Sequence, residues 1–242
     1  MNWIEFVAML RSILFTAILF LNVCPYSLFV LIARPFGTRA SYAVGRSWGR
    51  TTLWFCKVLC GLDFTVEGRE NLPAENGVVF MKHSSAYETI AQWIIFPRQC
   101  WVLKRELMWV PFLGWALAAL HSIAINRSAG QLAVQQVIDK GKERLTEGLW
   151  VIIFPEGTRM EPGKTRRYGV SGTLLAQDAG RLIVPVAHNA GDFWPRRGLL
   201  KRPGTVKFCI GPPIDPAGRP PREVNQEIQN WIEAKVAEIR KR

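Results

Sequence analysis

A long uncharged segment near the N-terminus constrains the fold of this chain more than any other feature. Ser12 to Ala33 contains 22 consecutive residues without a charge, enough for a helix to cross a hydrocarbon core of about 30 Å. Pro25 lies inside the segment and removes one helical hydrogen bond. The sequence therefore predicts either one kinked span or two shorter apolar helices that enter one leaflet. A cleaved signal peptide is less consistent with it, because Glu5 precedes the segment and no A-x-A site follows.

The composition agrees with a globular body that is attached to a membrane. Hydrophobic residues make up 49% of the chain, which is high for a soluble enzyme and low for a polytopic membrane protein. Ten tryptophans support membrane attachment, because indoles collect at the membrane–water interface. The formal net charge of +12 predicts an anionic partner: nucleic acid, acidic lipid headgroups or a phosphorylated substrate. The five cysteines form no C-x-x-C pair, so we expect free, apolar side chains on a reducing, cytosolic side.

Beyond residue 40 the hydrophobic pattern alternates between strands and helices. Expected strands are 63–67, 78–81, 101–103, 122–125, 150–154, 182–186 and 206–210, and expected helices are 40–60, 85–96, 106–120, 129–146 and 172–179. An amphipathic helix after Pro220 and Pro221 closes the chain. This alternation is typical of an α/β fold with a mixed, largely buried sheet flanked by helices. We expect membrane-associating helices in residues 1–38 and a single α/β domain in residues 39–242.

The apolar stretch from Leu107 to Ala124 has two readings. With 18 residues it is long enough for a second membrane span. Pro111 and Gly114 interrupt it, and polar residues flank it closely on both sides. We therefore expect a buried or membrane-facing helix instead.

His83 is the histidine whose neighbours point most directly to chemistry. It follows a predicted strand and begins the run HSSAYE, which ends at Glu88. If Glu88 lies in the first turn of the next helix, its carboxylate can hold one imidazole nitrogen while the other accepts a proton. Ser85 to Glu88 is also a capping box, in which the glutamate only accepts a backbone N–H. The spacing leaves both interpretations open. His121 and His188 have no carboxylate at a useful spacing, so we expect them to be structural.

A second loop, Phe154–Arg159, reads FPEGTR and follows a predicted strand. Gly157 permits an unusual backbone turn, and Arg159 presents a planar fork suited to phosphate. More cations follow in the basic segment 164–167. An ordinary turn with solvated charges fits this loop equally well. No spacing typical of metal ligands occurs in the sequence, so we expect neither a metal nor a resident cofactor.

These blocks together resemble the glycerolipid acyltransferases of phospholipid synthesis, specifically the bacterial 1-acyl-glycerol-3-phosphate acyltransferases. His83 and Glu88 match the first block, Ser122–Arg127 the second, Phe154–Arg159 the third residue for residue, and Val184–Val186 the fourth. All four blocks occur in the family's order. This chain departs from the family in one respect: the acid of the first block is more commonly Asp, whereas this chain has Glu88.

The resemblance implies an O-acyltransferase that moves a fatty acyl group from acyl-CoA or acyl carrier protein to the sn-2 hydroxyl of 1-acyl-glycerol-3-phosphate, giving phosphatidic acid. It implies His83 as the base and Glu88 as its orienting carboxylate. Lys104 and Arg159 would hold the acceptor's phosphate, and Arg127 would either assist them or line the site from beneath. Glu156 and Gly157 would shape the loop and contact the glycerol part, and Thr158 of the same loop would also bind substrate. It also implies membrane lipids as partners and an active site on the cytoplasmic side of the inner membrane.

Other cations and other functions stay open. Lys201, Arg202 and Lys207 would meet the donor's phosphates, an anionic membrane or only solvent. The same chemistry could act on another lysolipid, such as lyso-ornithine lipid or lysophosphatidylglycerol. A non-catalytic protein that binds anionic lipid is the alternative from another class, but binding alone requires no base. Nucleic-acid binding is weaker, because the tryptophans lie mostly in apolar runs. The sequence also lacks the G-x-S-x-G turn of many hydrolases.

Overall fold

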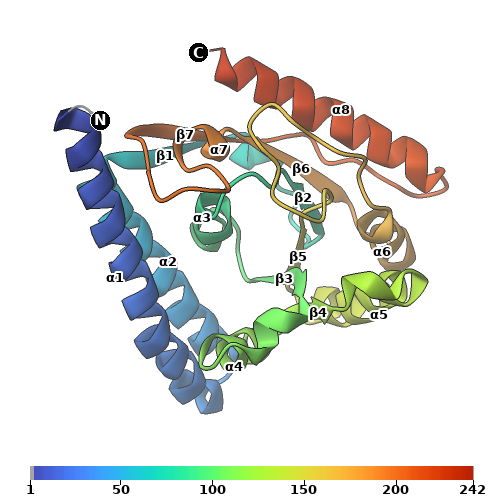
Figure 1. The fold of residues 1–242 in the computed structure, drawn as a ribbon. Coiled ribbons are helices and arrows are strands. Elements are labelled where there is room, and N and C mark those ends of the chain that lie inside the picture. The colour runs from blue at the N-terminus through green and yellow to red at the C-terminus, as the bar shows by residue number, and fades with distance from the viewer. Residues whose placement is uncertain (1–2, 242) are drawn as a thin grey trace.

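A seven-stranded mixed sheet forms the centre of the computed structural model, which describes residues 3–241 (Figure 1). The strands lie in the order β1-β7-β6-β2-β5-β3-β4. Neighbouring strands are parallel except for β6 and β7, which are antiparallel. Their bounds are β1 Leu62–Glu67, β2 Val78–Met81, β3 Gln99–Lys104, β4 Ile123–Ile125, β5 Trp150–Ile153, β6 Ile183–His188 and β7 Gly204–Ile210.

Helices cover both faces of this sheet. Their bounds are α1 Trp3–Ala33, α2 Thr38–Cys60, α3 Tyr87–Ile95, α4 Leu113–Ala119, α5 Gln131–Thr146, α6 Ser171–Ala179, α7 Ala190–Phe193 and α8 Pro221–Arg240, with short 3-10 turns η1 Arg34–Phe36, η2 Arg69–Asn71, η3 Arg105–Trp109 and η4 Arg127–Ala129. Figure 1 shows α1 and α2 together along one side and α5 and α6 along the other. The predicted α/β class with a mixed, buried sheet is confirmed.

The central strand β2 is buried on both faces. Val78 and Phe80 pack in a cluster with residues of α6 and α8, whereas Val79 and Met81 pack in a second cluster with residues of α2 and α3. Successive side chains of a strand point to opposite faces, so four consecutive apolar residues give a strand that is covered on both sides. The residue after β2 is therefore held between two packed layers.

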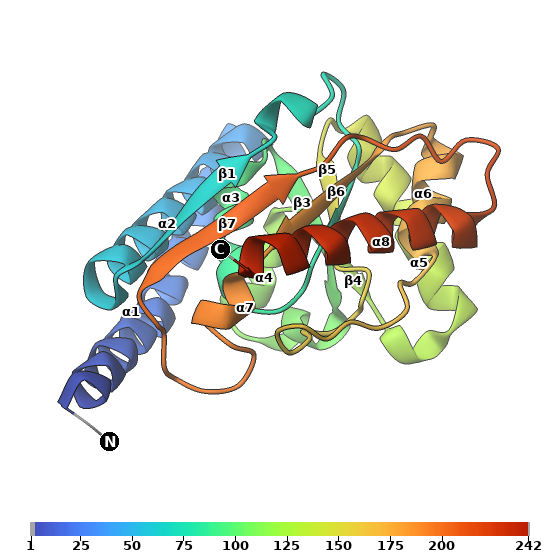
Figure 2. The same cartoon turned by 90° about the horizontal axis from the view of Figure 1, so that it is seen from above.

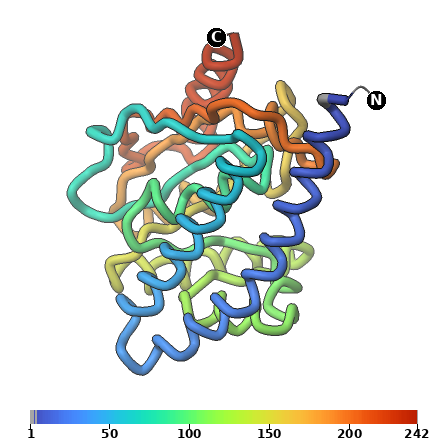
Figure 3. The backbone as a smooth tube through the Cα atoms, turned by 90° about the vertical axis from the view of Figure 1, so that its left-hand side faces the viewer, coloured from blue at the N-terminus to red at the C-terminus, as the bar shows by residue number. Residues whose placement is uncertain are grey.

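The N-terminal segment forms one continuous helix rather than two. α1 runs through Pro25, whose missing N–H removes a single bond from a helix of 31 residues. Among the described residues, one helical segment is long and apolar enough to cross a membrane. This segment, Glu5–Phe36, consists of most of α1 together with η1. It lies along α2 (Figure 3). Much of its apolar surface stays uncovered by the rest of the chain, including Phe20 and Leu21.

Lys201 fastens α1 to the body of the protein. Its side chain is buried, and its ammonium group donates to the carbonyl oxygen of Leu199 at 2.8 Å and to the Thr16 hydroxyl. The same ammonium lies over the rings of Phe15 and Trp194. The prediction that Lys201 meets donor phosphates, a membrane surface or solvent is therefore wrong, because the cation is enclosed by α1.

The predicted helix over 106–120 is also wrong, because the segment breaks in the middle. It forms the short turn η3, a kink with Phe112 at φ 63°, and then α4. Pro111 stops η3, and α4 with its seven residues is far too short to cross a bilayer. One side of α4 is buried through Ala116 and Leu117, and the other exposes Trp115. The other predicted elements agree with the structure within two residues.

Candidate active site

His83 lies at the carboxyl edge of the sheet, two residues after Met81, the last residue of β2. In open α/β sheets, ligands bind outside the carboxyl ends of the parallel strands. A half-open groove of about 470 Å³ occupies this edge. Its lining comes from α3, β3, η3, α4 and η4 and from the loops after β2, β5 and α7: His83, Thr89, Gln92, Trp101, Val102, Leu103, Lys104, Leu107, Leu113, Leu117, Arg127, Phe154, Thr158, Arg159 and Arg196.

The imidazole of His83 is oriented by Glu88. His83 Nδ1 lies 2.8 Å from Glu88 Oε1, and the Glu88 side chain is completely buried. The ring also stacks on Phe154, with centroids 4.1 Å apart. When Nδ1 carries the proton that it donates to Glu88, Nε2 keeps its lone pair for an incoming hydroxyl. The pair therefore has the geometry of a base with an orienting carboxylate.

Glu88 also has the capping role that the sequence left open. The same Oε1 accepts the backbone N–H of Ser85 at 3.2 Å, and the Ser85 hydroxyl accepts the N–H of Tyr87 at 3.1 Å. The two interpretations are thus compatible, because one carboxylate oxygen serves both. The turn that begins α3 fixes the carboxylate that orients His83.

Glu156 points away from the groove. Its side chain is fully buried, with Oε1 2.7 Å from Lys82 Nζ and Oε2 accepting the backbone N–H of His83 at 2.8 Å. Burial raises the pKa of Glu156, and the Lys82 charge opposes that shift. The expectation that Glu156 contacts the glycerol part of a substrate is therefore corrected: this carboxylate supports His83 from behind.

His188 supports the same peptide from the other side. It is buried, its Nε2 lies 2.7 Å from the carbonyl oxygen of Lys82, and its Nδ1 accepts the N–H of Ala190 at 3.2 Å. Burial lowers the pKa of His188, which agrees with a neutral ring that donates from Nε2. His121 lies apart from this site and contacts Glu147 at 2.6 Å. The long-range contact with Glu147 could not be seen in the local sequence.

Four of the residues expected to bind the substrate line the groove. They are the cations Lys104, Arg127 and Arg159, together with Thr158. The Arg127 guanidinium also donates to the carbonyl oxygen of Gly157, so it braces the loop as well. Gly157 itself has φ 66°, a conformation that favours glycine, and it lines a neighbouring pocket rather than this groove.

Arg196 is a groove residue that the sequence analysis missed. It lies in the loop after Trp194 and reaches the same groove as Arg159. One feature of the sequence could have indicated this residue: Arg196 and Arg197 form a basic pair directly after a proline. Nothing in the local sequence shows that this loop folds over the carboxyl ends of β2 and β5.

Apolar side chains also line the groove. Trp101, Leu113 and Leu117 line it, and the same three residues line a small apolar cavity of about 80 Å³ between α1, α2, α3 and α4. A groove lined by both cations and hydrocarbon fits an anionic amphiphile. Within residues 3–241 no group of histidine, cysteine, aspartate or glutamate side chains could hold a metal ion.

Comparisons with known proteins agree with this geometry. The family model named Acyltransferase matches residues 63–189. The 1-acyl-sn-glycerol-3-phosphate acyltransferase of Pseudomonas aeruginosa is 41% identical over 236 residues, which cover 95% of this chain and 91% of that one. The protein of that name in Saccharomyces cerevisiae is 38% identical over 60% of this chain and 50% of its own. The crystal structure of the 1-acyl-sn-glycerophosphate acyltransferase of Thermotoga maritima superposes with a TM-score of 0.81 at 24% identity and 96% coverage of both chains, a likeness of fold.

Proposed function

The chain belongs to the acyltransferase family, and we propose that it acylates the sn-2 hydroxyl of 1-acyl-glycerol-3-phosphate to make phosphatidic acid. The observation that supports this most is the position of the His83–Glu88 pair, in a groove lined by both cations and apolar side chains. A lysophosphatidic acid has a phosphate, a free hydroxyl and an acyl chain, in that order. The name of the Pseudomonas relative agrees with this acceptor.

His83 acts as the base in the proposed reaction. Nε2 takes the proton of the acceptor hydroxyl while its oxygen attacks the carbonyl carbon of the acyl thioester. The tetrahedral intermediate then collapses, the C–S bond breaks, and the imidazolium returns the proton to the leaving thiolate. Glu88 keeps Nδ1 protonated and stabilises the positive charge of the imidazolium. The products are an ester and a free thiol, so no oxidant, reductant or covalent acyl-enzyme is needed.

The donor in this proposal is a thioester of coenzyme A or of acyl carrier protein, used as a co-substrate rather than held as a cofactor. Both carry the acyl group on the same phosphopantetheine arm, so the groove sees the same thioester in either case. The acyl chain of one substrate would lie along the apolar side chains of Trp101, Leu113 and Leu117. Holding both substrates at one histidine supplies much of the rate enhancement.

We also propose that the groove faces a membrane from the cytoplasmic side. The exposed apolar surface of α1 supports attachment, and Trp109 and Trp115 expose indoles beside the groove on η3 and α4. Tryptophan is enriched at the membrane–water interface. An acceptor could then enter from the bilayer with its phosphate close to the cations of the groove. Donors carried by coenzyme A or a carrier protein are water-soluble, which favours the cytoplasmic side.

The proposed function is tested with purified protein in detergent, labelled acyl-CoA or acyl carrier protein, and a panel of lysolipids. Lysophosphatidic acid, lysophosphatidylglycerol and lyso-ornithine lipid are compared at equal concentration. We expect phosphatidic acid to form with the highest kcat/KM. A preference for another lysolipid would move the proposal to that acceptor, and binding of lipid without any product would reject catalysis altogether.

Arg159 is expected to recognise the acceptor rather than the donor. Arg159→Ala should raise KM for the lysolipid about 10–100-fold, since a hydrogen bond to a charged group is worth about 1.5–3 kcal/mol. The KM for the thioester should change much less, and Arg159→Lys should rescue poorly because it lacks the planar fork. Initial rates across both concentrations measure this. Arg166→Ala, an exposed arginine outside the groove, is the control. Equal effects on both substrates would mean that Arg159 supports the loop.

Membrane attachment is expected to depend on the exposed face of α1. Deleting the helix would also strip the partners of the buried Lys201, so point changes are cleaner. The double variant Phe20→Glu/Leu21→Glu changes two side chains that are 70% and 74% exposed. Burying each new charge in the hydrocarbon core would cost about 2.5–3.5 kcal/mol. The variant should move into the soluble fraction yet still acylate a short-chain, water-soluble acceptor. Leu132→Glu, at an exposed leucine of α5, should stay with the membrane. A double variant that remains fully membrane-bound would place attachment elsewhere.

A further inference from the structure

Lys82 is a buried cation next to His83, and its partners come from three separate parts of the chain. Its ammonium group lies 2.7 Å from Glu156 Oε1, 2.7 Å from Glu233 Oε1 and 2.9 Å from the carbonyl oxygen of Lys164. The side chain is only 2% exposed. An ammonium group has three N–H donors, so these three acceptors use all of them.

This network reaches His83 through Glu156. One oxygen of Glu156 is held by Lys82, and the other accepts the backbone N–H of His83 at 2.8 Å. The carbonyl oxygen of His83 accepts the N–H of Met160 at 2.7 Å, and that of Lys82 lies 2.7 Å from His188 Nε2. The peptide groups on both sides of His83 are therefore fixed, and Glu156 supplies one of the bonds that fix them.

Glu233 connects the C-terminal helix to this network. It lies on α8, which packs along β6 (Figure 2) and is outside the residues matched by the family model. Its Oε1 accepts from Lys82 and also from the Tyr168 hydroxyl at 3.3 Å. The apolar face of α8, including Ile228 and Ile232, is buried in the core. That packing fixes the position of the Glu233 carboxylate.

Two more polar side chains on the same face of α8 hold the loop that follows the FPEGTR segment. Asn225 and Gln229 precede Glu233 at intervals of four residues, which places all three on one side of the helix. Asn225 Nδ2 donates to the carbonyl oxygen of Gly169 at 3.0 Å, and Gln229 Nε2 donates to that of Arg166 at 3.2 Å. α8 thus holds both this loop and the Lys82 ammonium group in place.

We propose that Lys82 and Glu233 are positioning residues for acyl transfer, which hold Glu156 in the orientation that fixes the backbone of His83. This inference rests on His83 as the base proposed above. A buried ion network gives little net stability, because desolvation offsets the attraction between its charges. Placement of the base is a sufficient reason to keep it, since a displacement of about 1 Å can lower a rate about 10²-fold.

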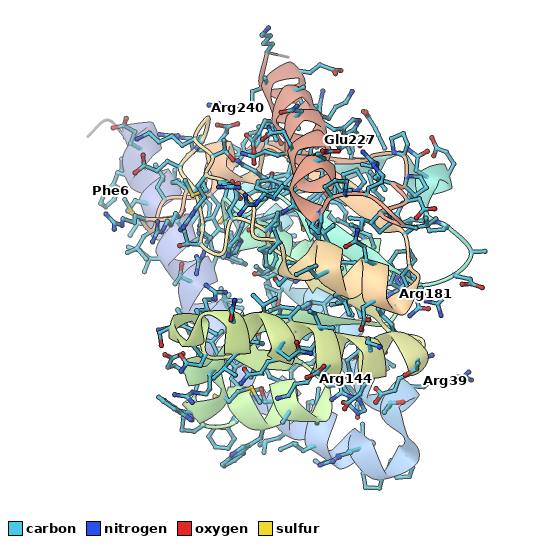
Figure 4. The ribbon with its side chains drawn as sticks, turned by 90° about the vertical axis from the view of Figure 1, so that its right-hand side faces the viewer. Phe6, Arg39, Arg144, Arg181, Glu227 and Arg240 are labelled. Atoms are coloured by element: carbon cyan, nitrogen blue, oxygen red, sulfur yellow. The ribbon has the colours of Figure 1, made fainter. Side chains whose placement is uncertain are left out.

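The test compares two glutamates of the same helix. Glu233→Gln removes the charge at Lys82, whereas Glu227→Gln removes a charge from an exposed ion pair with Arg219. Figure 4 labels Glu227 on α8. Glu233→Gln should lower kcat by about 10–100-fold and change both KM values less than about threefold. Glu233→Asp, which keeps the charge, should retain more activity than Glu233→Gln. Glu227→Gln should match the wild type.

A double-mutant cycle with Glu156→Gln separates positioning from general stability. If Glu233 acts through Glu156, Glu233→Gln should have little further effect on kcat when Glu156 is already glutamine. Additive losses, wild-type kcat in Glu233→Gln, or a loss of activity that only follows unfolding in thermal melts would each overturn the inference. If Glu233→Gln keeps full activity while His83→Ala is inactive, only the positioning role is overturned. An active His83→Ala would instead reject the proposed base.

Discussion

His83→Ala is expected to lower the rate of acyl transfer by about 10²–10⁴-fold, the usual contribution of a positioned general base. The residue is the one titratable side chain in the groove whose ring is both held by a buried carboxylate and stacked against Phe154. Without the imidazole, the acceptor hydroxyl has no group positioned to take its proton. Initial rates at saturating concentrations of both substrates measure the effect on kcat.

Two further variants make the result specific. Alanine leaves the buried Glu88 without its partner, which costs stability on the scale of about 1–3 kcal/mol. His83→Gln keeps a donor for Glu88 but cannot act as a base, so it should be as inactive as alanine and more stable. His121→Ala, which removes a surface histidine with its own carboxylate contact at Glu147, should stay active. Activity of His83→Ala within about tenfold of the wild type would remove it as the base.

The fold could be predicted wherever a local pattern decides the structure. The four apolar residues Val78 to Met81 form a strand buried on both faces, and their neighbours Lys82 and Gly77 bound it in the sequence. Gly61 ends α2 with φ 66°, as a glycine at that position predicts. These signals lie within a few residues of the feature that they specify. The local sequence is therefore sufficient to predict these features.

Long-range packing explains where the predictions failed. The segment 106–120 has helical periodicity, but Pro111 and the positive φ of Phe112 turn the chain so that Leu113 and Leu117 line the groove. Pro25 left one kinked span and two shorter helices equally open, and the structure has one continuous helix, with α2 packed along it. Neither outcome follows from the local sequence, since both depend on surfaces contributed by distant elements.

The candidate site shows the same division. His83 and Glu88 are five residues apart, so their pairing could be inferred from a loop and the first turn of a helix. The family resemblance implied that Glu156 contacts the substrate. Its actual partner Lys82 is 74 positions away, and Glu233, which completes that network, is 151 positions from Lys82. A contact at that separation leaves no trace in a single sequence.

Glu88→Gln is the second change with a large expected effect, of about 10²–10⁴-fold on kcat. Glutamine has an amide oxygen that can accept both the Ser85 N–H and the Nδ1–H of His83, so the cap and the ring orientation can survive. It has no negative charge to stabilise the imidazolium that forms in the transition state. A comparable change in a serine protease triad lowers kcat about 10⁴-fold.

The stability of the same variant separates the two roles of Glu88. Its Oε2 is buried without a hydrogen-bond partner among the described residues and lies 4.0 Å from His188 Nε2, so replacing that oxygen by an amide breaks no existing bond. Thermal melts should therefore show a loss of at most about 1 kcal/mol, the scale of a helix cap. Glu88→Asp restores the charge and should be more active than glutamine despite its shorter arm. If glutamine instead matches the wild type in rate, Glu88 serves only as a cap, and His83 acts without a carboxylate partner.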